Sequence, residues 1–277
     1  MATIIDQMTQ IYCFVDDYLK AHQKLSLWRS SNNCQPQFTD SEVITIALMQ
    51  PSLGVATLKK AYSIIAENFR SAFPKLCSYK QWIARLHALS EIIGHLVESA
   101  RKSDGFQTKL FIFDSKPIAV CKPIRHCRAR LMREEGAWFG KTSKGWFFGF
   151  KLHASINING HFVGGILTPG NLDDRQAAVA LGLNSDGGIA LCDLGYSGDQ
   201  IAEEVMDEAE MLLITKADAQ EREALICSLR SRIETFFSQL WAMFIDRVYS
   251  RSWRGLWNTI KLKLFFYNLR HAGILSV

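Results

Sequence analysis

The stretch "KLFIFDSKPI", residues 109–118, decides the fold of the second part of this chain. Its four consecutive apolar residues, 110–113, predict a buried strand, and Asp114 follows them directly. Asp-Ser-Lys-Pro is good turn chemistry, so Asp114 could be an ordinary turn residue. A carboxylate at the end of a buried strand could instead bind a metal ion on a rigid scaffold.

The sequence after residue 109 alternates between strand and helix patterns. Strands are predicted at 110–113, 145–158, 161–169, 188–193 and 211–215, and helices at 173–183, 199–209 and 220–244. Asn159-Gly160, between the second and third strands, is a strong hairpin signal. The order β-β-β-α-β-α-β-α predicts an α/β fold with a mixed β-sheet flanked by helices.

The first hundred residues have helical patterns throughout. Helices are predicted at 41–50, capped by Asp40 and ended by Pro51, then at 55–69, and at 79–102 with apolar residues three and four apart. The predicted domains are therefore a helical region, 1–100, and an α/β domain, 105–277. The helical region could bind DNA or could be a packing or dimerisation bundle, and the sequence leaves both open.

Composition favours a globular protein with a sizeable core. The chain has 277 residues, 48% of them hydrophobic and 21% charged, with no apolar run long enough for a membrane span. Its seven cysteines form no C-x-x-C pair, which predicts reduced thiols and a cytoplasmic location. The grouping of Cys121, His126 and Cys127 fits no common zinc spacing.

Positive charge is concentrated in one block. Residues 116–151 contain nine Lys or Arg and two Glu, an excess of 9 − 2 = +7 in a chain whose net charge is +5. A basic block of this kind suits a polyanion such as nucleic acid, although a solvated loop would look the same. The part 116–146 is interpreted as a basic insertion in the α/β domain.

Three carboxylates occupy related places in this layout. Asp114 follows the first strand, Asp193 follows the fourth, and Glu234 lies on the last helix, beside the apolar stripe expected to pack on the sheet. Taken singly, they could be a turn residue, a helix cap and an ion-pair partner of Arg230. If the first and fourth strands are neighbours, all three acids converge at one end of the sheet.

Converging carboxylates suit divalent cations. Unpaired at close range, they repel one another and raise one another's pKa values. Mg²⁺ or Mn²⁺ relieves that repulsion, because these ions prefer oxygen ligands. Two such ions, about 4 Å apart, can activate a water or a 3′-hydroxyl and stabilise the leaving oxygen of a phosphodiester.

At these residues the chain resembles the DDE transposases of bacterial insertion sequences, which have an RNase H-like catalytic domain. The matching stretches are "FDSKPIAVCKPIR", "GFKLHASI", "LTPGNLDDR", "LCDLGYSG" and "RSRIETFFSQL", within about residues 110–270. The spacings are 193 − 114 = 79 and 234 − 193 = 41 residues. The resemblance implies that Asp114, Asp193 and Glu234 form the catalytic, metal-binding triad, with two Mg²⁺ or Mn²⁺ ions as cofactor.

The chain departs from the family pattern on the last helix. Many relatives have a Tyr–Arg–Glu–Lys signature there, but the Tyr and Lys places hold Cys227 and Trp241, and only Arg230 and Glu234 match. The link before that helix, residues 216–223, is also short, which would fit an inactive copy.

Basic side chains around the acids are candidates for DNA contact. They are Lys116, Arg125, Arg128, Arg130, Lys151, Arg230, Arg251 and Arg254. His153 could contact DNA or could be a hydrogen-bonded histidine within the sheet. Asp173 and Asp174 are expected to cap the following helix rather than bind metal. The aromatic residues of 249–267 could stack on unpaired bases or could pack inward.

The expected function is DNA transposition on the nucleoid. The protein would bind the terminal inverted repeats of its element, free a 3′-hydroxyl and join it to target DNA, acting at least as a homodimer. The alternatives are a nuclease of the same fold and a catalytically decayed or repurposed DNA-binding protein.

Overall fold

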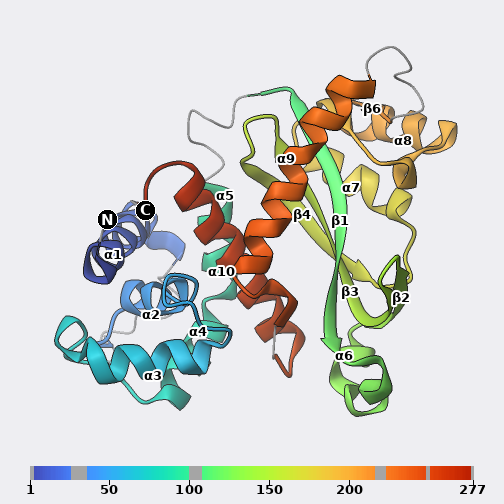
Figure 1. Cartoon of the computed structure of the whole chain (residues 1–277). Helices are drawn as coiled ribbons and strands as arrows, with labels where there is room; N and C mark the ends of the chain where they lie inside the picture. Colours follow the sequence, from blue (N-terminus) through green and yellow to red (C-terminus); the bar gives the residue numbers. More distant parts are fainter. Residues whose placement is uncertain (1–2, 26–35, 100–107, 216–222, 248–249, 276–277) are drawn as a thin grey trace. The chain divides into compact units, whose positions relative to one another are not determined.

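The computed structural model describes residues 3–25, 36–99, 108–215, 223–247 and 250–275 (Figure 1). The chain forms two compact units. The helical unit comprises Met1–Ala100 and Arg254–Val277, and the sheet unit comprises Arg101–Trp253. Within the described ranges, no helix has the length and apolar character that a bilayer crossing needs.

The helical unit is built from helices, four of which begin with a capping Thr or Ser. Its helices are α1 (Ile4–Ala21), α2 (Asp40–Leu48), α3 (Leu58–Asn68), α4 (Tyr79–Ala88), α5 (Ser90–Ser99) and most of α10 (Trp253–His271), with 3₁₀ turns η1 (Gln23–Leu25) and η3 (Arg70–Ala72). Thr3, Thr39 and Ser78 begin α1, α2 and α4 with capping boxes, in which cap and third helical residue exchange side-chain hydrogen bonds. The cap of α2 is therefore Thr39 and not Asp40, which is already helical.

The helix predicted at 79–102 is two helices. The amide of Leu89 donates to the carbonyls of Arg85 and Leu86 at the end of α4, and α5 begins at Ser90. The apolar residues predicted to share one face are all buried: Trp82, Leu86, Leu89, Ile93 and Leu96. The apolar spacing runs unchanged across Leu89, so it identified the buried face without indicating the break.

The C-terminal helix α10 packs with the N-terminal helices. Asn258 accepts a hydrogen bond from the Ser90 hydroxyl and donates to the Leu86 carbonyl at 3.3 Å, and Lys261 Nζ donates to the Ser90 carbonyl at 3.2 Å. Residues 254–277 therefore belong with residues 1–100, and the sequence-based boundary that placed them in the α/β domain is corrected.

The aromatic residues of α10 lie inside the helical unit. Phe265, Phe266 and Tyr267 are buried, and the ring centroids of Phe14 and Phe265 are 5.7 Å apart. Burial excludes stacking of these three rings on DNA bases in this conformation. The sequence left open whether these residues stack on unpaired bases or pack inward, and Phe265, Phe266 and Tyr267 pack inward.

The sheet unit contains one six-stranded mixed sheet. Its strands are β1 (Leu110–Cys121), β2 (Trp138–Thr142), β3 (Gly145–Asn157), β4 (Phe162–Pro169), β5 (Gly188–Leu191) and β6 (Met211–Ile214). The order is β2-β3-β1-β5-β6, and β4 pairs with β3 beyond the end of β2. β1 pairs antiparallel with β3 and parallel with β5. This mixed sheet confirms the predicted fold class, and the hairpin at Asn159-Gly160 joins β3 to β4.

Helices α7 (Ala178–Leu183), α8 (Asp199–Ala209) and α9 (Glu223–Ala242) cover the two faces of the sheet. The short helix α6 (Arg130–Glu134) lies between β1 and β2 in the chain, and the 3₁₀ turns are η6 (Pro123–Arg128), η7 (Asp174–Ala177), η8 (Leu194–Tyr196) and η10 (Ile245–Arg247). Phe111 and Phe113 share a core with residues of α7 and α8. Lys116 lies 5.7 Å from the ring centroid of Phe237 on α9, and Phe236 stacks on Phe162. Because side chains alternate along a strand, α9 covers the face opposite to α7 and α8 (Figure 1).

Strand β1 is longer than the sequence predicted. It continues through Asp114 to Cys121, because β3 pairs with it over that whole length. Asp114 is paired with Ala154 in the middle of the strand, so the turn interpretation of Asp-Ser-Lys-Pro is wrong.

Candidate active site

Asp114 and Asp193 lie at corresponding points of neighbouring parallel strands. The last β1–β5 pair is Ile112 with Leu191. Asp114 follows Ile112 by two residues, and Asp193 follows Leu191 by two residues. Since Phe113 and Cys192 point into the core shared with α7 and α8, alternation directs both aspartates to the face that α9 covers. The two strands are therefore neighbours, which was the condition for the expected convergence of the acids.

The Asp114 carboxylate is largely removed from water. Its side chain is 17% exposed, its Oδ1 accepts from the Ser115 amide at 2.8 Å, and Lys116 Nζ lies 4.0 Å from its Oδ2. Burial raises the pKa of Asp114 above its ordinary value, although Lys116 and Arg230 oppose that shift and Asp193 adds to it. A desolvated carboxylate beside a second one is favoured as an anion when a further cation joins it.

Arg230 links α9 to the edge of the sheet. Its Nη1 donates to Asp193 Oδ1 at 3.0 Å; the Arg230 side chain is 12% exposed and that of Asp193 is 53% exposed. The guanidinium therefore places a positive charge in direct contact with Asp193. This contact places the middle of α9 next to the two aspartates.

Glu234 does not join the aspartates in a cluster. It is exposed on α9, one turn after Arg230 and therefore on the same side of the helix. Among the described residues, no three His, Cys, Asp or Glu side chains are grouped closely enough to hold a metal ion. The structure thus brings Asp114 and Asp193 together and leaves the third predicted ligand exposed on the adjoining helix.

Asp173 and Asp174 have different roles on the opposite face. Asp173 caps η7 as predicted, and its hydrogen bonds from Arg175 lower the pKa of its carboxyl to about 2. Asp174 instead accepts from Ser115 Oγ at 2.9 Å and from Lys151 Nζ at 2.7 Å. This link could not be predicted from the sequence, because Ser115 and Asp174 are brought together only by the folding of η7 against β1.

His153 is a core histidine. It is fully buried, and its ring nitrogens hydrogen-bond with Tyr196 Oη at 3.1 Å and Thr168 Oγ1 at 2.8 Å. A neutral imidazole, with one donor and one acceptor nitrogen, satisfies both partners. Burial, the largest cause, lowers its pKa to about 4. His153 is therefore a hydrogen-bonded histidine within the sheet. Its predicted contact with DNA is corrected, because a fully buried side chain cannot touch DNA.

Comparison with known proteins agrees with this geometry. A family model described as "Transposase DDE domain" matches residues 104–247. The chain belongs to this family. No curated protein and no solved structure matches the chain. The sheet with its flanking helices is that of an RNase H-like DDE domain, as the resemblance implied.

The basic residues predicted to contact DNA fall into several groups. One pocket of about 510 Å³ is lined by four of them: Arg125, Arg128, Arg130 and Arg251. These residues come from η6, α6 and residues 250–251. Lys116 and Arg230 lie beside the two aspartates.

Lys151 and Arg254, the other two basic residues predicted to contact DNA, lie outside these groups. Lys151 is held by Asp174 and by the carbonyl of Leu172. Arg254 is exposed but belongs to the helical unit.

Proposed function

We propose that this chain is a divalent-metal-dependent DNA transposase. It would bind the terminal inverted repeats of its own element, hydrolyse a phosphodiester to free a 3′-hydroxyl, and join that hydroxyl to target DNA. The observation that carries the proposal is the meeting of Asp114 and Asp193 on adjacent parallel strands of a DDE domain. Because two element ends must be joined, at least a homodimer is expected on DNA.

The residues present fit Mg²⁺ or Mn²⁺. Asp114 and Asp193 offer hard oxygen donors, and burial disfavours the charge on Asp114 unless a cation compensates it. These two residues would hold the metal, and Glu234 would complete the set from α9. When bound, two divalent ions supply Lewis-acid stabilisation of the attacking and leaving oxygens.

The protein's own basic residues would position the DNA. Arg230, which donates to Asp193, would place a positive charge beside the phosphate that enters the site. The arginines of the 510 Å³ pocket would neutralise phosphates further along the strand. Phosphate contacts of this kind fix the position of the duplex without reading its sequence.

A cleavage assay tests the assignment. Purified protein, labelled DNA carrying the inverted repeats that flank the gene, and Mg²⁺ are incubated with wild type, Asp193→Asn and Glu234→Gln. Each variant is expected to lose more than about a hundredfold in rate, because a metal ligand contributes several kcal/mol to the transition state. Asp207→Asn, an exposed aspartate of α8, is the matched control and should cleave normally. Cleavage by Asp193→Asn at the wild-type rate would refute the site.

One observation favours a second candidate. Glu234 is exposed and no three-carboxylate cluster exists among the described residues, as in a protein that binds repeats without cutting them. Metal-independent binding with no nicking under any divalent ion would support this non-catalytic DNA-binding protein. Cleavage without strand-transfer products would instead indicate a nuclease of the same fold.

A further inference from the structure

The β2–β3 hairpin presents aromatic and basic side chains together at the surface. Trp146 is 63% exposed, and Lys141, its cross-strand partner, places Nζ 5.9 Å from the centroid of the Trp146 ring. A tryptophan this exposed leaves a large apolar ring in water without stabilising the core. An exposed indole with a cation over its ring combines the two features that suit a planar, negatively charged ligand, a surface for stacking and a positive charge.

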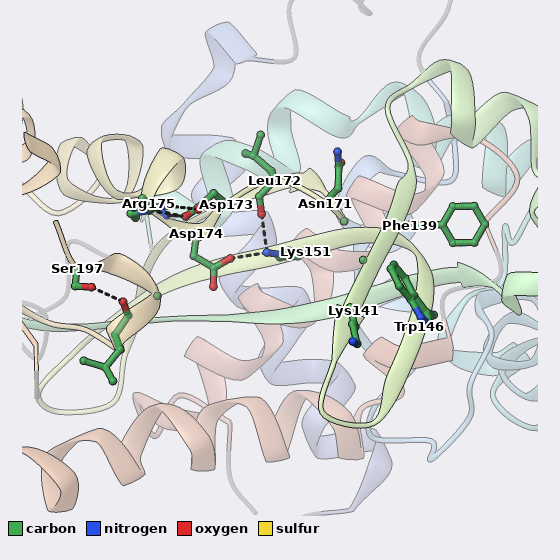
Figure 2. A pocket seen from close by; sticks show the side chains of 14 residues that line it. Phe139, Lys141, Trp146, Lys151, Asn171, Leu172, Asp173, Asp174, Arg175 and Ser197 are labelled. Atoms are coloured by element: carbon green, nitrogen blue, oxygen red, sulfur yellow. Dashed lines mark hydrogen bonds and ion pairs between the residues drawn. The ribbon is translucent and has the colours of Figure 1, made fainter.

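The hairpin forms one wall of a pocket of about 570 Å³ (Figure 2). Phe139, Lys141 and Trp146 line it from the hairpin side. The opposite wall includes Leu194, Gly195 and Ser197, which directly follow Asp193 in the chain. The pocket therefore lies between the hairpin and the segment that follows a predicted catalytic residue.

Close backbone packing holds the hairpin in place. A Cβ atom at Gly140 would lie 2.3 Å from the Gly170 carbonyl oxygen, and one at Gly170 would lie 2.7 Å from the Trp138 carbonyl oxygen. Only glycine permits this approach of two backbones. The wall that carries Trp146 is consequently fixed against the end of β4 before any ligand binds, which lowers the cost of ordering it.

The charge around the pocket favours an anion. No acidic residue lies between Glu135 and Asp173, whereas Lys141 and Lys144 lie on the hairpin. The acids that do line the pocket are paired: Asp173 with Arg175 at 2.6 Å, and Asp174 with Lys151 at 2.7 Å (Figure 2). Lys141 thus lines a pocket whose two carboxylates are each paired with a basic side chain.

We propose that this pocket binds an unpaired nucleotide at a DNA end, with the base stacked on Trp146 and its phosphate beside Lys141. Unpaired bases offer the flat face that an exposed indole stacks on, and their backbone supplies the negative charge. The inference rests on the proposed function in that DNA is the substrate. It goes beyond that function by stating which DNA the protein prefers, namely a duplex with a single-stranded end.

A binding experiment tests this without cleavage. Fluorescence anisotropy in EDTA compares a blunt duplex with the same duplex carrying a short single-stranded run of thymidines. The wild-type protein should bind the second DNA more tightly. Trp146→Ala should weaken that binding about tenfold and leave binding of the blunt duplex within about twofold, since one stacking contact is lost. Trp146→Phe should keep part of the preference, and Lys141→Gln should lower the slope of log affinity against log salt by about 1.

Trp138 provides the matched control. It lies on the same hairpin and is 49% exposed, but it does not line the pocket. Trp138→Ala should retain the preference for the single-stranded end. Equal wild-type binding of both DNAs, an unchanged preference in Trp146→Ala, or the same loss in Trp138→Ala would each overturn the proposal. A protein that prefers the single-stranded end but never cleaves DNA would refute the proposed function and leave this inference standing. A protein that cleaves DNA but binds both DNAs equally would refute this inference and leave the proposed function standing.

Discussion

Acid should destabilise the sheet unit through His153. This side chain is fully buried, and its hydrogen bonds with Tyr196 and Thr168 suit the neutral imidazole. Its pKa falls from 6.5 to about 4 on folding, chiefly through burial. Between these values the unfolded chain binds a proton that the folded chain excludes, so stability falls as the pH falls through this window.

The size of the effect follows from the shift. A difference of 6.5 − 4 corresponds to about 3 kcal/mol if the titration is complete. When the pH is lowered from about 7 to about 4.5, about 2 kcal/mol of this contribution to the free energy of unfolding should be lost. The comparison variant is His153→Gln, which cannot titrate and which should be less stable than wild type near neutrality because a buried hydrogen bond is lost.

Chemical denaturation across this pH range measures both proteins. The difference in free energy of unfolding between wild type and His153→Gln should shrink by about 2 kcal/mol on acidification, since other groups titrate alike in both. A difference that stays constant from about pH 7 to about pH 4.5 would mean that His153 is not held neutral by its surroundings.

Three further substitutions test backbone and capping features by thermal or chemical unfolding. Gly140→Ala should destabilise the sheet unit by about 1–3 kcal/mol, since its Cβ would lie 2.3 Å from a backbone oxygen that cannot move alone; an unchanged melting temperature would contradict this. Gly94→Ala should stabilise α5 by about 0.5–1 kcal/mol, because its Cβ would meet only Lys261 Nζ at 3.5 Å; a loss of stability would indicate a clash not seen here. Thr39→Ala should cost about 1 kcal/mol by removing the capping box of α2, whereas Thr39→Ser should be nearly neutral; equal losses would assign the effect to something other than the hydroxyl.

The central sheet could be predicted because its strands are short apolar runs separated by clear turn signals. Asn159-Gly160 gave the hairpin, and the run 110–113 gave the buried core of β1. The length of β1 could not be predicted, because pairing with β3 keeps Asp114 and Pro117 in the strand against their local turn preference. Long-range pairing outweighed local propensity there.

The region between β1 and β3 was predicted only as a basic block. Its helix α6 has five residues and its strand β2 also has five, and neither is long enough to show a period. The pocket formed by Lys141 and Trp146 with the segment after Asp193 was therefore invisible in the sequence. Its members come from separate segments that only the folded sheet unit brings together.

The site was predicted in part. The meeting of Asp114 and Asp193 was expected if the first and fourth predicted strands are neighbours, and these strands are paired in the sheet. The position of Glu234 depends on the rotation of α9 about its own axis, and apolar spacing fixes that rotation only coarsely. The contact of Arg230 with Asp193 and the exposure of Glu234 could be found only from the three-dimensional arrangement.

The packing of α10 against α4 and α5 has a consequence for synthesis of the chain. Ribosomes deliver the N-terminal helices first, yet Asn258, Lys261 and Phe265 complete their core only after the whole intervening unit has been translated. The sheet unit, which is contiguous, can reach its native contacts earlier. Until translation passes α10, the earliest residues would expose the apolar surface that this helix later covers, so nascent chains are the stage at which chaperone binding and aggregation should be strongest.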